Sequence, residues 1–171
     1  EKIAQSVDKP AQHRRRKVTS GQHHAAARVF AEPTGESGFT TVYLPCRRRM
    51  RISELRGNLR KLKITNHRVL DVSYPANKVV ALLVHKEYAK ELLERFDAAG
   101  VKPIENFDPL DDKVLKDPKW TEKTDLERRE QATKLHRVRC LVALDHIRIP
   151  ARYAVARHFV HLGWIEGETL Q

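Results

Sequence analysis

The sequence has little of what builds secreted or membrane proteins. Its 171 residues include two cysteines, Cys46 and Cys140, which are too few and too far apart for a disulfide framework. No apolar run approaches the roughly eighteen residues that cross a bilayer, and no secretory hydrophobic segment is visible. We therefore expect a protein of the cytoplasm or nucleus, with no membrane partner.

Catalytic signatures are also missing. The chain has no glycine-rich phosphate loop, no G-x-S-x-G and no H-E-x-x-H, and the aspartates of residues 108–117 lie in a proline-containing segment that would not fix their geometry. Two pairs at helical spacing, His136 with Cys140 and His158 with His161, could converge on zinc. There is no C-x-x-C, and both pairs lie on helices where they can pack in the core, so we expect no metal. Since the catalytic signatures are missing as well, we expect no enzyme and no cofactor.

Basic residues, in contrast, are abundant and unevenly placed. The formal net charge is +11, and the excess of basic over acidic residues is three in residues 1–38, eight in residues 39–104 and zero in residues 105–171. A local basic field concentrates polyanions and speeds their encounter. Nucleic acid is the commonest such partner, although an anionic membrane surface, an acidic protein or solubility alone would also account for the excess.

The middle of the chain alternates between strand and helix patterns. Alternating or continuous apolar residues predict strands over residues 40–46, 68–74 and 79–84. A short last strand is expected over residues 101–104, where Pro103 confines it to a sheet edge.

Two helices separate these strands. Ser53 can cap the first, whose apolar stripe contains Leu55, Leu59 and Leu62, and the second ends at Gly100 after burying Tyr88, Leu92 and Phe96. The order βαββαβ is that of a ferredoxin-like, RRM-like α+β sheet. Both helices would cover one face and leave the other open to a ligand.

The flanking segments complete the expected organisation: a flexible basic arm over residues 1–38, the sheet domain over 39–104, a linker over 105–124 and a helical extension over 125–171. Thr124-x-x-Glu127 is a capping box that starts a long helix, which Pro150 ends. A second helix ends at Gly163. Their broad apolar faces must pack on the sheet, on each other or on a second copy. The expected apolar positions are Leu126, Leu135, Val138, Leu141, Val142 and Ile147, then Ala151, Ala154, Val155, His158, Phe159 and Leu162.

The strongest candidate site is an arginine cluster between the first strand and the first helix. Guanidinium groups bind phosphate oxygens bidentately, and a helix N-terminus adds backbone donors. A basic stripe on the helix extends the cluster, although such a stripe alone can be a solvated helix face, and the basic run of the arm can equally be an import signal or a solubilising tail. The candidate phosphate contacts are Arg14, Arg15, Arg16, Lys17, Arg47, Arg48, Arg49, Arg51, Arg56, Arg60 and Lys63.

Tyr43 is the candidate base-stacking residue. Val42-Tyr43-Leu44 resembles the first of the two signature motifs of the RNA-recognition motif, in which aromatics on the two central strands stack bases. The other central strand, residues 79–84, has no aromatic residue and would make a better packing surface. We therefore expect the C-terminal helices to cover this face, with Tyr43 packed beneath them and the arginine loop and arm as the binding surface.

Several segments resemble a domain found in proteins of fungal retrotransposons. They are Leu55-Arg56-x-x-Leu59-Arg60-x-Leu62, Arg68-Val69-Leu70-Asp71-Val72-Ser73-Tyr74-Pro75, Val84-His85-x-x-Tyr88, Phe107-Asp108-Pro109-Leu110, Ala154-x-Ala156-Arg157-x-Phe159 and Gly163-Trp164-Ile165. The resemblance covers about residues 25–166. It implies a nucleic-acid-binding Gag-like or first-open-reading-frame region that binds element RNA or cDNA in a ribonucleoprotein. The zinc knuckle that often accompanies such regions is missing from this stretch.

The expected function is therefore a module that binds RNA or single-stranded nucleic acid mainly through phosphate contacts, with little sequence specificity. One alternative is a ribosomal or other ribonucleoprotein assembly protein. Another is a protein-interaction module without nucleic-acid contact, which self-associates through its C-terminal helices.

Overall fold

Three strands form the centre of the protein, whose computed structural model describes residues 38–167. The strands are β1 (Phe39–Pro45), β2 (Val69–Ala76) and β3 (Val79–His85). The sheet order is β1-β3-β2, and β3 pairs antiparallel with both neighbours. The expected α+β class and three of the expected strands are thus confirmed, while the arm residues Arg14, Arg15, Arg16 and Lys17 lie outside the described residues.

The expected fourth strand is not formed, and residues 101–104 are a loop beside β1. The N–H of Ile104 donates to the carbonyl of Tyr43 at 2.8 Å. Pro103 has no N–H to continue a ladder. The segment therefore follows the edge of β1 without pairing regularly with it.

Two helices cover one face of the sheet: α2 (Ile52–Lys61) and α3 (Lys86–Ala98). Leu55, Leu59, Tyr88, Leu92 and Phe96 pack in one core with the strand side chains of that face, as expected from their spacing. Gly100 follows α3 with a φ of 71°, the left-handed conformation that glycine adopts without strain. Ser53 does not cap α2, because the helix begins at Ile52 and its N-cap residue is the extended Arg51.

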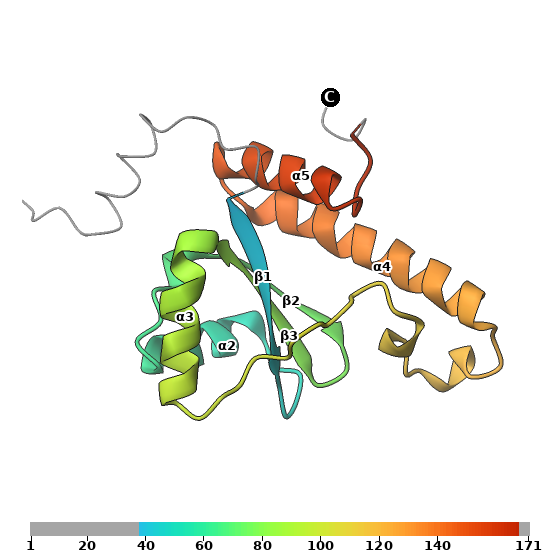
Figure 1. The fold of residues 1–171 in the computed structure, drawn as a ribbon, viewed down its shortest axis with the longest axis horizontal. Helices are drawn as coiled ribbons and strands as arrows, with labels where there is room; N and C mark the ends of the chain where they lie inside the picture. Colours follow the sequence, from blue (N-terminus) through green and yellow to red (C-terminus); the bar gives the residue numbers. More distant parts are fainter. Residues whose placement is uncertain (1–37, 168–171) are drawn as a thin grey trace, which may run out of the picture. The chain divides into compact units, whose positions relative to one another are not determined.

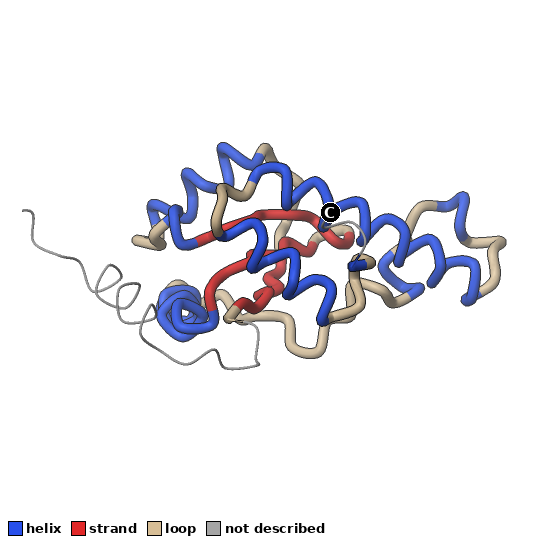
Figure 2. Tube along the Cα trace, turned by 90° about the horizontal axis from the view of Figure 1, so that it is seen from above, coloured by secondary structure: helices blue, strands red, loops and turns tan. Residues whose placement is uncertain are grey.

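The other face is covered by α4 (Asp125–His146) and α5 (Ala151–His161). Phe39 and Leu83 of the sheet form a second core with Cys140, Ala143 and Phe159 of these helices. The strands therefore lie between two helical layers, α2 and α3 on one side and α4 and α5 on the other (Figure 1). Figure 2 shows the strands enclosed among the helices from above. The covered sheet face is as expected, and an open one is excluded.

The long helix buries only part of the side that its apolar residues indicate: Ile147 at its end is buried and Leu141 packs on the second core. Leu126, Val138 and Val142 are 69%, 56% and 49% exposed, so their expected burial is wrong. The buried side carries mainly smaller or polar residues. The buried residues of α4 are Ala132, His136, Cys140, Ala143 and Leu144. In α5, the expected Val155, His158 and Phe159 are buried, whereas Leu162 is exposed.

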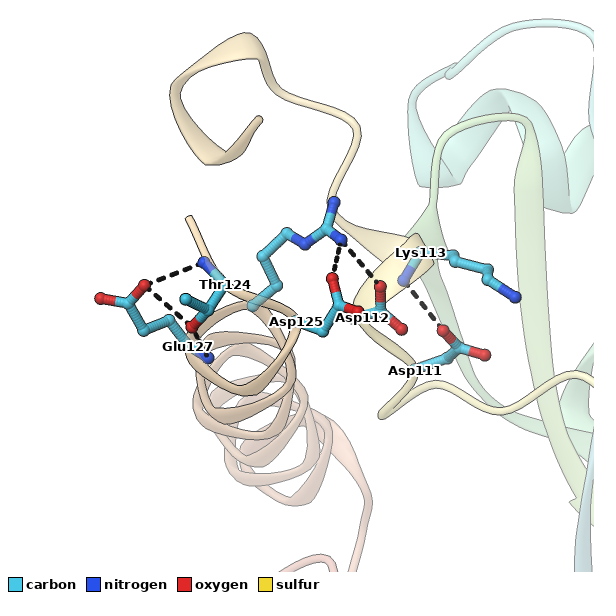
Figure 3. Close-up of polar contacts among 7 residues, drawn as sticks. Asp111, Asp112, Lys113, Thr124, Asp125 and Glu127 are labelled. Atoms are coloured by element: carbon cyan, nitrogen blue, oxygen red, sulfur yellow. Dashed lines mark hydrogen bonds and ion pairs between the residues drawn. The ribbon is translucent and has the colours of Figure 1, made fainter. Parts of the chain in front are cut away.

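The segment between α3 and α4 contains two short 3₁₀ turns, η2 (Asp112–Val114) and η3 (Pro118–Trp120). Asp112 forms an ion pair at 3.2 Å with Arg128, which also pairs with Asp125. Figure 3 shows these carboxylates together with the capping box of Thr124 and Glu127, which forms as expected. The segment is thereby held against the start of α4. None of the described helices is long and apolar enough to cross a membrane.

Candidate nucleic-acid interface

Hydrogen bonds hold the backbone of the arginine loop, residues 46–51, at both of its ends. The N–H of Cys46 donates to the carbonyl of Lys78 at 2.8 Å, and the Cys46 thiol donates to the carbonyl of Arg48. At its other end the hydroxyl of Tyr74 donates to the carbonyl of Met50 at 3.1 Å. These bonds join the loop to the β2–β3 hairpin, so that its side chains project from a defined position.

The four arginines of the loop have different surroundings. The guanidinium carbon of Arg49 lies 5.4 Å from the ring centroid of Tyr74, within reach of a cation–π attraction. Arg48 forms an ion pair with Glu54 at 2.9 Å, and both side chains are largely exposed. Arg47 and Arg51 are exposed. The loop thus presents several cations to solvent, and one of them, Arg48, is already partnered.

The basic stripe of α2 is interrupted at Arg56. Its guanidinium donates to the carbonyls of Asn66 and Val69 at 3.2 and 3.3 Å, and Asn66 donates back to the Arg56 carbonyl. This side chain therefore ties α2 to the start of β2. Arg60 and Lys63 are exposed, but Lys63 lies beyond the end of the helix with a φ of 59°.

Tyr43 points to the covered side of the sheet. Its ring packs against Phe107 with a centroid separation of 4.6 Å, and burial raises the pKa of its phenol. Together with His136, Cys140 and Trp164 it lines an interior space of only about 30 Å³, room for about one water molecule. The space that Tyr43 shares with α4 therefore has no room for a base, although Tyr43 and Phe107 also line an open hollow of about 820 Å³.

A larger cavity of about 500 Å³ lies beside the arginine loop. Four separate parts of the chain line it: the loop, the β2–β3 hairpin, the segment around η3, and α4. Apolar side chains, Val114, Leu115 and Leu135, make up part of its wall. We call this cavity the basic cleft after its principal lining residues, which are Arg49, Lys78, Lys116, Lys119 and Arg139 with the aromatic Tyr74 and Trp120.

Local geometry explains how two of the cleft lysines reach it. Lys78 occupies the tight β2–β3 turn with a φ of 59°, and Lys119 belongs to η3, whose preceding residue Asp117 accepts a hydrogen bond from the Lys119 N–H. The sequence pattern placed Lys78 just before a strand, and it assigned Lys116, Lys119 and Trp120 to a linker. The one local signal of a site was Lys119-Trp120, a cation beside an aromatic residue.

Positive charge in the basic cleft is poorly compensated. Asp117 is the sole carboxylate among the lining residues, and it pairs with Lys119 at 3.0 Å. Within residues 38–167 no ion pair is formed by Arg49, Lys78, Lys116 or Arg139. Burial lowers the pKa of Arg139, and the charge of Arg49 lowers it further. An anion bound here would offset this uncompensated charge.

The two histidine pairs do not form a metal site. His136 Nε2 lies 3.7 Å from the sulfur of Cys140, and the imidazole meets the edge of Trp164 at 4.4 Å. Burial lowers the pKa of His136 to about 4 and raises that of Cys140 to about 12. No group of three or more His, Cys, Asp or Glu side chains is placed to hold a metal in the part of the chain that the structure describes.

Comparisons with other proteins give no match: no protein-family model, no curated protein and no solved structure is similar to the chain. The function proposed below therefore rests on the geometry and charge of the basic cleft and the arginine loop.

Proposed function

We propose that the protein binds single-stranded nucleic acid, mainly RNA, through the basic cleft and the adjoining arginine loop. The observation that supports this proposal is the combination of four cations without an ion pair and two aromatic rings in one cavity. Phosphate contacts supply most of the affinity in such complexes, and aromatic rings stack on bases of any sequence. The binding should therefore be strong at low salt and weakly selective for sequence.

The shape of the site favours a nucleic acid over an anionic membrane. A bilayer surface is flat on the scale of a protein and contacts projecting cations, whereas the cations here line a hollow of about 500 Å³. A single strand can place an unstacked nucleotide in a hollow of this kind. Double-stranded nucleic acid keeps its bases stacked and would reach exposed cations outside the hollow, such as Arg47 and Arg51.

The proposed interface differs in part from the one that the sequence indicates. Tyr43 is packed and Arg56 is occupied by backbone carbonyls, so neither belongs to it. Tyr74 and Trp120 replace Tyr43 as stacking residues. The loop arginines remain, and Arg60 and Lys63 on the surface beyond, with Arg14, Arg15, Arg16 and Lys17 of the arm, stay predicted contributors.

We further propose that the sheet with α2 and α3 is a ferredoxin-like domain whose last strand has been reduced to a loop. The order β1-β3-β2 and the bond from Ile104 to Tyr43 at the edge of β1 support this reading. A role in a retroelement ribonucleoprotein, in the cytoplasm or nucleus, follows from the sequence resemblance and stays a proposal.

The proposal is tested with two charge-matched double variants. Lys78→Gln with Lys116→Gln removes two cations from the cleft, and Lys90→Gln with Lys102→Gln removes two exposed cations outside it. Fluorescence anisotropy with a labelled oligouridylate should show that the affinity of the cleft variant is at least about fivefold lower than that of the wild type. The slope of log K against log salt should fall by up to about 1.4, at about 0.7 per phosphate contact on a single strand. If the two double variants showed the same affinity and the same salt slope, the cleft would be excluded from the interface.

A second candidate function, self-association through the C-terminal helices, is favoured by one observation. Val138 and Val142 on α4 and Tyr153 on α5 are about half exposed, at 56%, 49% and 54%. Two helices can bury such residues against a second copy. Light scattering between about 5 and 200 µM should then show a dimer that Val138→Lys disrupts, and a monomer throughout this range would exclude the idea.

A further inference from the structure

Arg49 and Arg139 lie in the basic cleft, in surroundings that favour the binding of a strongly charged anion. Arg139 projects from α4, is partly buried, and has one guanidinium nitrogen, Nη1, that is buried with no hydrogen-bond partner. Arg49 reaches the same cleft from the arginine loop, where it lies over Tyr74. In the described part of the chain no carboxylate pairs with either guanidinium.

The wall around them increases the need for an anion. Val114, Leu115 and Leu135 line the same cavity and displace water from around the charges. Repulsion between two cations grows as water is excluded, and the partial burial of Arg139 disfavours its charged form. A ligand that carries two negative charges relieves both effects, whereas a single charge neutralises only one guanidinium.

Nucleic acid offers both kinds of anion. Each internal phosphodiester carries one negative charge. A terminal phosphomonoester, with a second pKa near 6, carries about 1.5 to 2 negative charges at neutral pH and three acceptor oxygens. Two guanidinium groups can each bind two oxygens of such a group in parallel. The charge and the donor number of the arginine pair therefore match a strand end better than the middle of a strand.

We propose that Arg49 and Arg139 form a site for the terminal phosphomonoester of a single strand, with the terminal base against Tyr74 or Trp120. This inference rests on the proposed function and narrows it to strand ends. The Tyr74 ring is held in place by the bond of its hydroxyl to Met50, and Trp120 is held by the backbone turn of η3. The cavity is of the size that accepts a nucleotide-sized ligand.

Three decauridylates provide the test: one with a 5′-phosphate, one with a 3′-phosphate and one with hydroxyl groups at both ends. Their affinities are compared by competition at one ionic strength and pH 7.5. One of the phosphorylated strands should bind about tenfold more tightly than the hydroxyl-ended strand. At pH 5.5 the advantage should fall to about threefold, because the phosphomonoester takes up a proton near pH 6.

Single variants identify the residues responsible. Arg139→Gln should reduce the affinity for the preferred phosphorylated strand about tenfold and that for the hydroxyl-ended strand about threefold. Arg49→Gln, which changes an exposed residue and should leave the fold intact, should have the same unequal effect. Arg157→Gln, on the exposed surface of α5, is the matched control and should leave the preference at about tenfold.

The outcomes separate this inference from the proposed function. Salt-dependent binding with equal affinity for all three strands would overturn the strand-end site and leave the proposed function standing. No binding of any strand would contradict the proposed function itself. Uridine monophosphate provides the last comparison. If it competes as strongly as the phosphorylated strand, the cleft takes free nucleotides and the assignment to strand ends is overturned.

Discussion

At the scale of single residues, an arginine in this protein either holds the fold together or is available for a ligand, and its surroundings decide which. Arg56 donates to two backbone carbonyls that join α2 to β2. Arg49 forms no hydrogen bond or ion pair in the described part of the chain and lies over an aromatic ring in the basic cleft. The two residues are chemically identical but should respond oppositely to substitution.

Arg56→Ala should lower the free energy of unfolding by about 1–3 kcal/mol, because the two carbonyls lose a charged donor. Its affinity for a single strand, measured well below the melting temperature, should stay within about twofold of the wild type. Arg49→Ala should show the reverse: an unchanged melting temperature and an affinity reduced at least about threefold. Urea denaturation and anisotropy on both variants check this, and a loss of affinity in Arg56→Ala alone would reverse the assignments.

Tyr43 provides the test of the covered sheet face. Tyr43→Ala removes a ring that packs on Phe107 under α4, so the free energy of unfolding should fall by about 2–4 kcal/mol. Tyr43→Phe, the control that keeps the ring, should cost about 1 kcal/mol or less. Affinity for single strands should change only about twofold in either variant. An unchanged melting temperature with a tenfold loss of affinity would mean that the tyrosine stacks on a base.

Burial of His136 makes stability depend on pH. Its pKa is lowered from 6.5 to about 4 by burial and by the charge of Arg139, and burial also lowers the pKa of His158. Below pH 6.5 these histidines become protonated in the unfolded chain but stay neutral in the folded chain. Protonation therefore favours unfolding, and the free energy of unfolding, which is at its full value above pH 6.5, falls toward pH 4. His136 alone should cost about 2 kcal/mol between pH 7.5 and pH 5.0. In His136→Gln this loss should be smaller, and an equal loss would assign it to other groups.

At the scale of elements, the helix α4 shows where prediction from sequence succeeds and where it stops. Its start was predictable, because the capping box of Thr124 and Glu127 is a local signal. Its orientation was not, because the large apolar Val138 and Val142 lie on the exposed side while the smaller Cys140 and Ala143 contact the sheet. In α2 and α3 the apolar side is also the buried side, so the same reasoning was correct there. The helix periodicity identifies an amphipathic side but not which partner it meets.

The orientation of α4 can be checked with a pair of neighbouring substitutions. Ala143 is 3% exposed and faces the sheet, whereas Val142 is 49% exposed. Ala143→Leu should lower the free energy of unfolding by about 1–3 kcal/mol, because the added atoms have no space. Val142→Leu should change it by about 0.5 kcal/mol or less. If Val142→Leu were the more destabilising of the two, α4 would be turned the other way.

At the scale of the whole molecule, the basic cleft is a product of tertiary structure. The arginine loop was predicted as a phosphate site from its composition, since consecutive arginines in a loop are a local feature. Lys78, Lys116 and Arg139 come from a hairpin turn, a 3₁₀-rich segment and a helix that lie far apart in sequence. No periodicity or spacing relates them, and the residues 105–171 that supply most of them have no net charge. Only the fold brings their charges together.

The account as a whole depends on phosphate contacts, and the salt dependence of binding measures these most directly. The affinity of the wild-type chain for an unstructured oligouridylate is measured between about 50 and 300 mM potassium chloride. Four cations without an ion pair in the basic cleft, together with the exposed loop arginines, predict a slope of log K against log salt of about −3 to −4, at about 0.7 per contact. A slope near zero would contradict the account, because the protein would then bind no phosphate backbone through this surface.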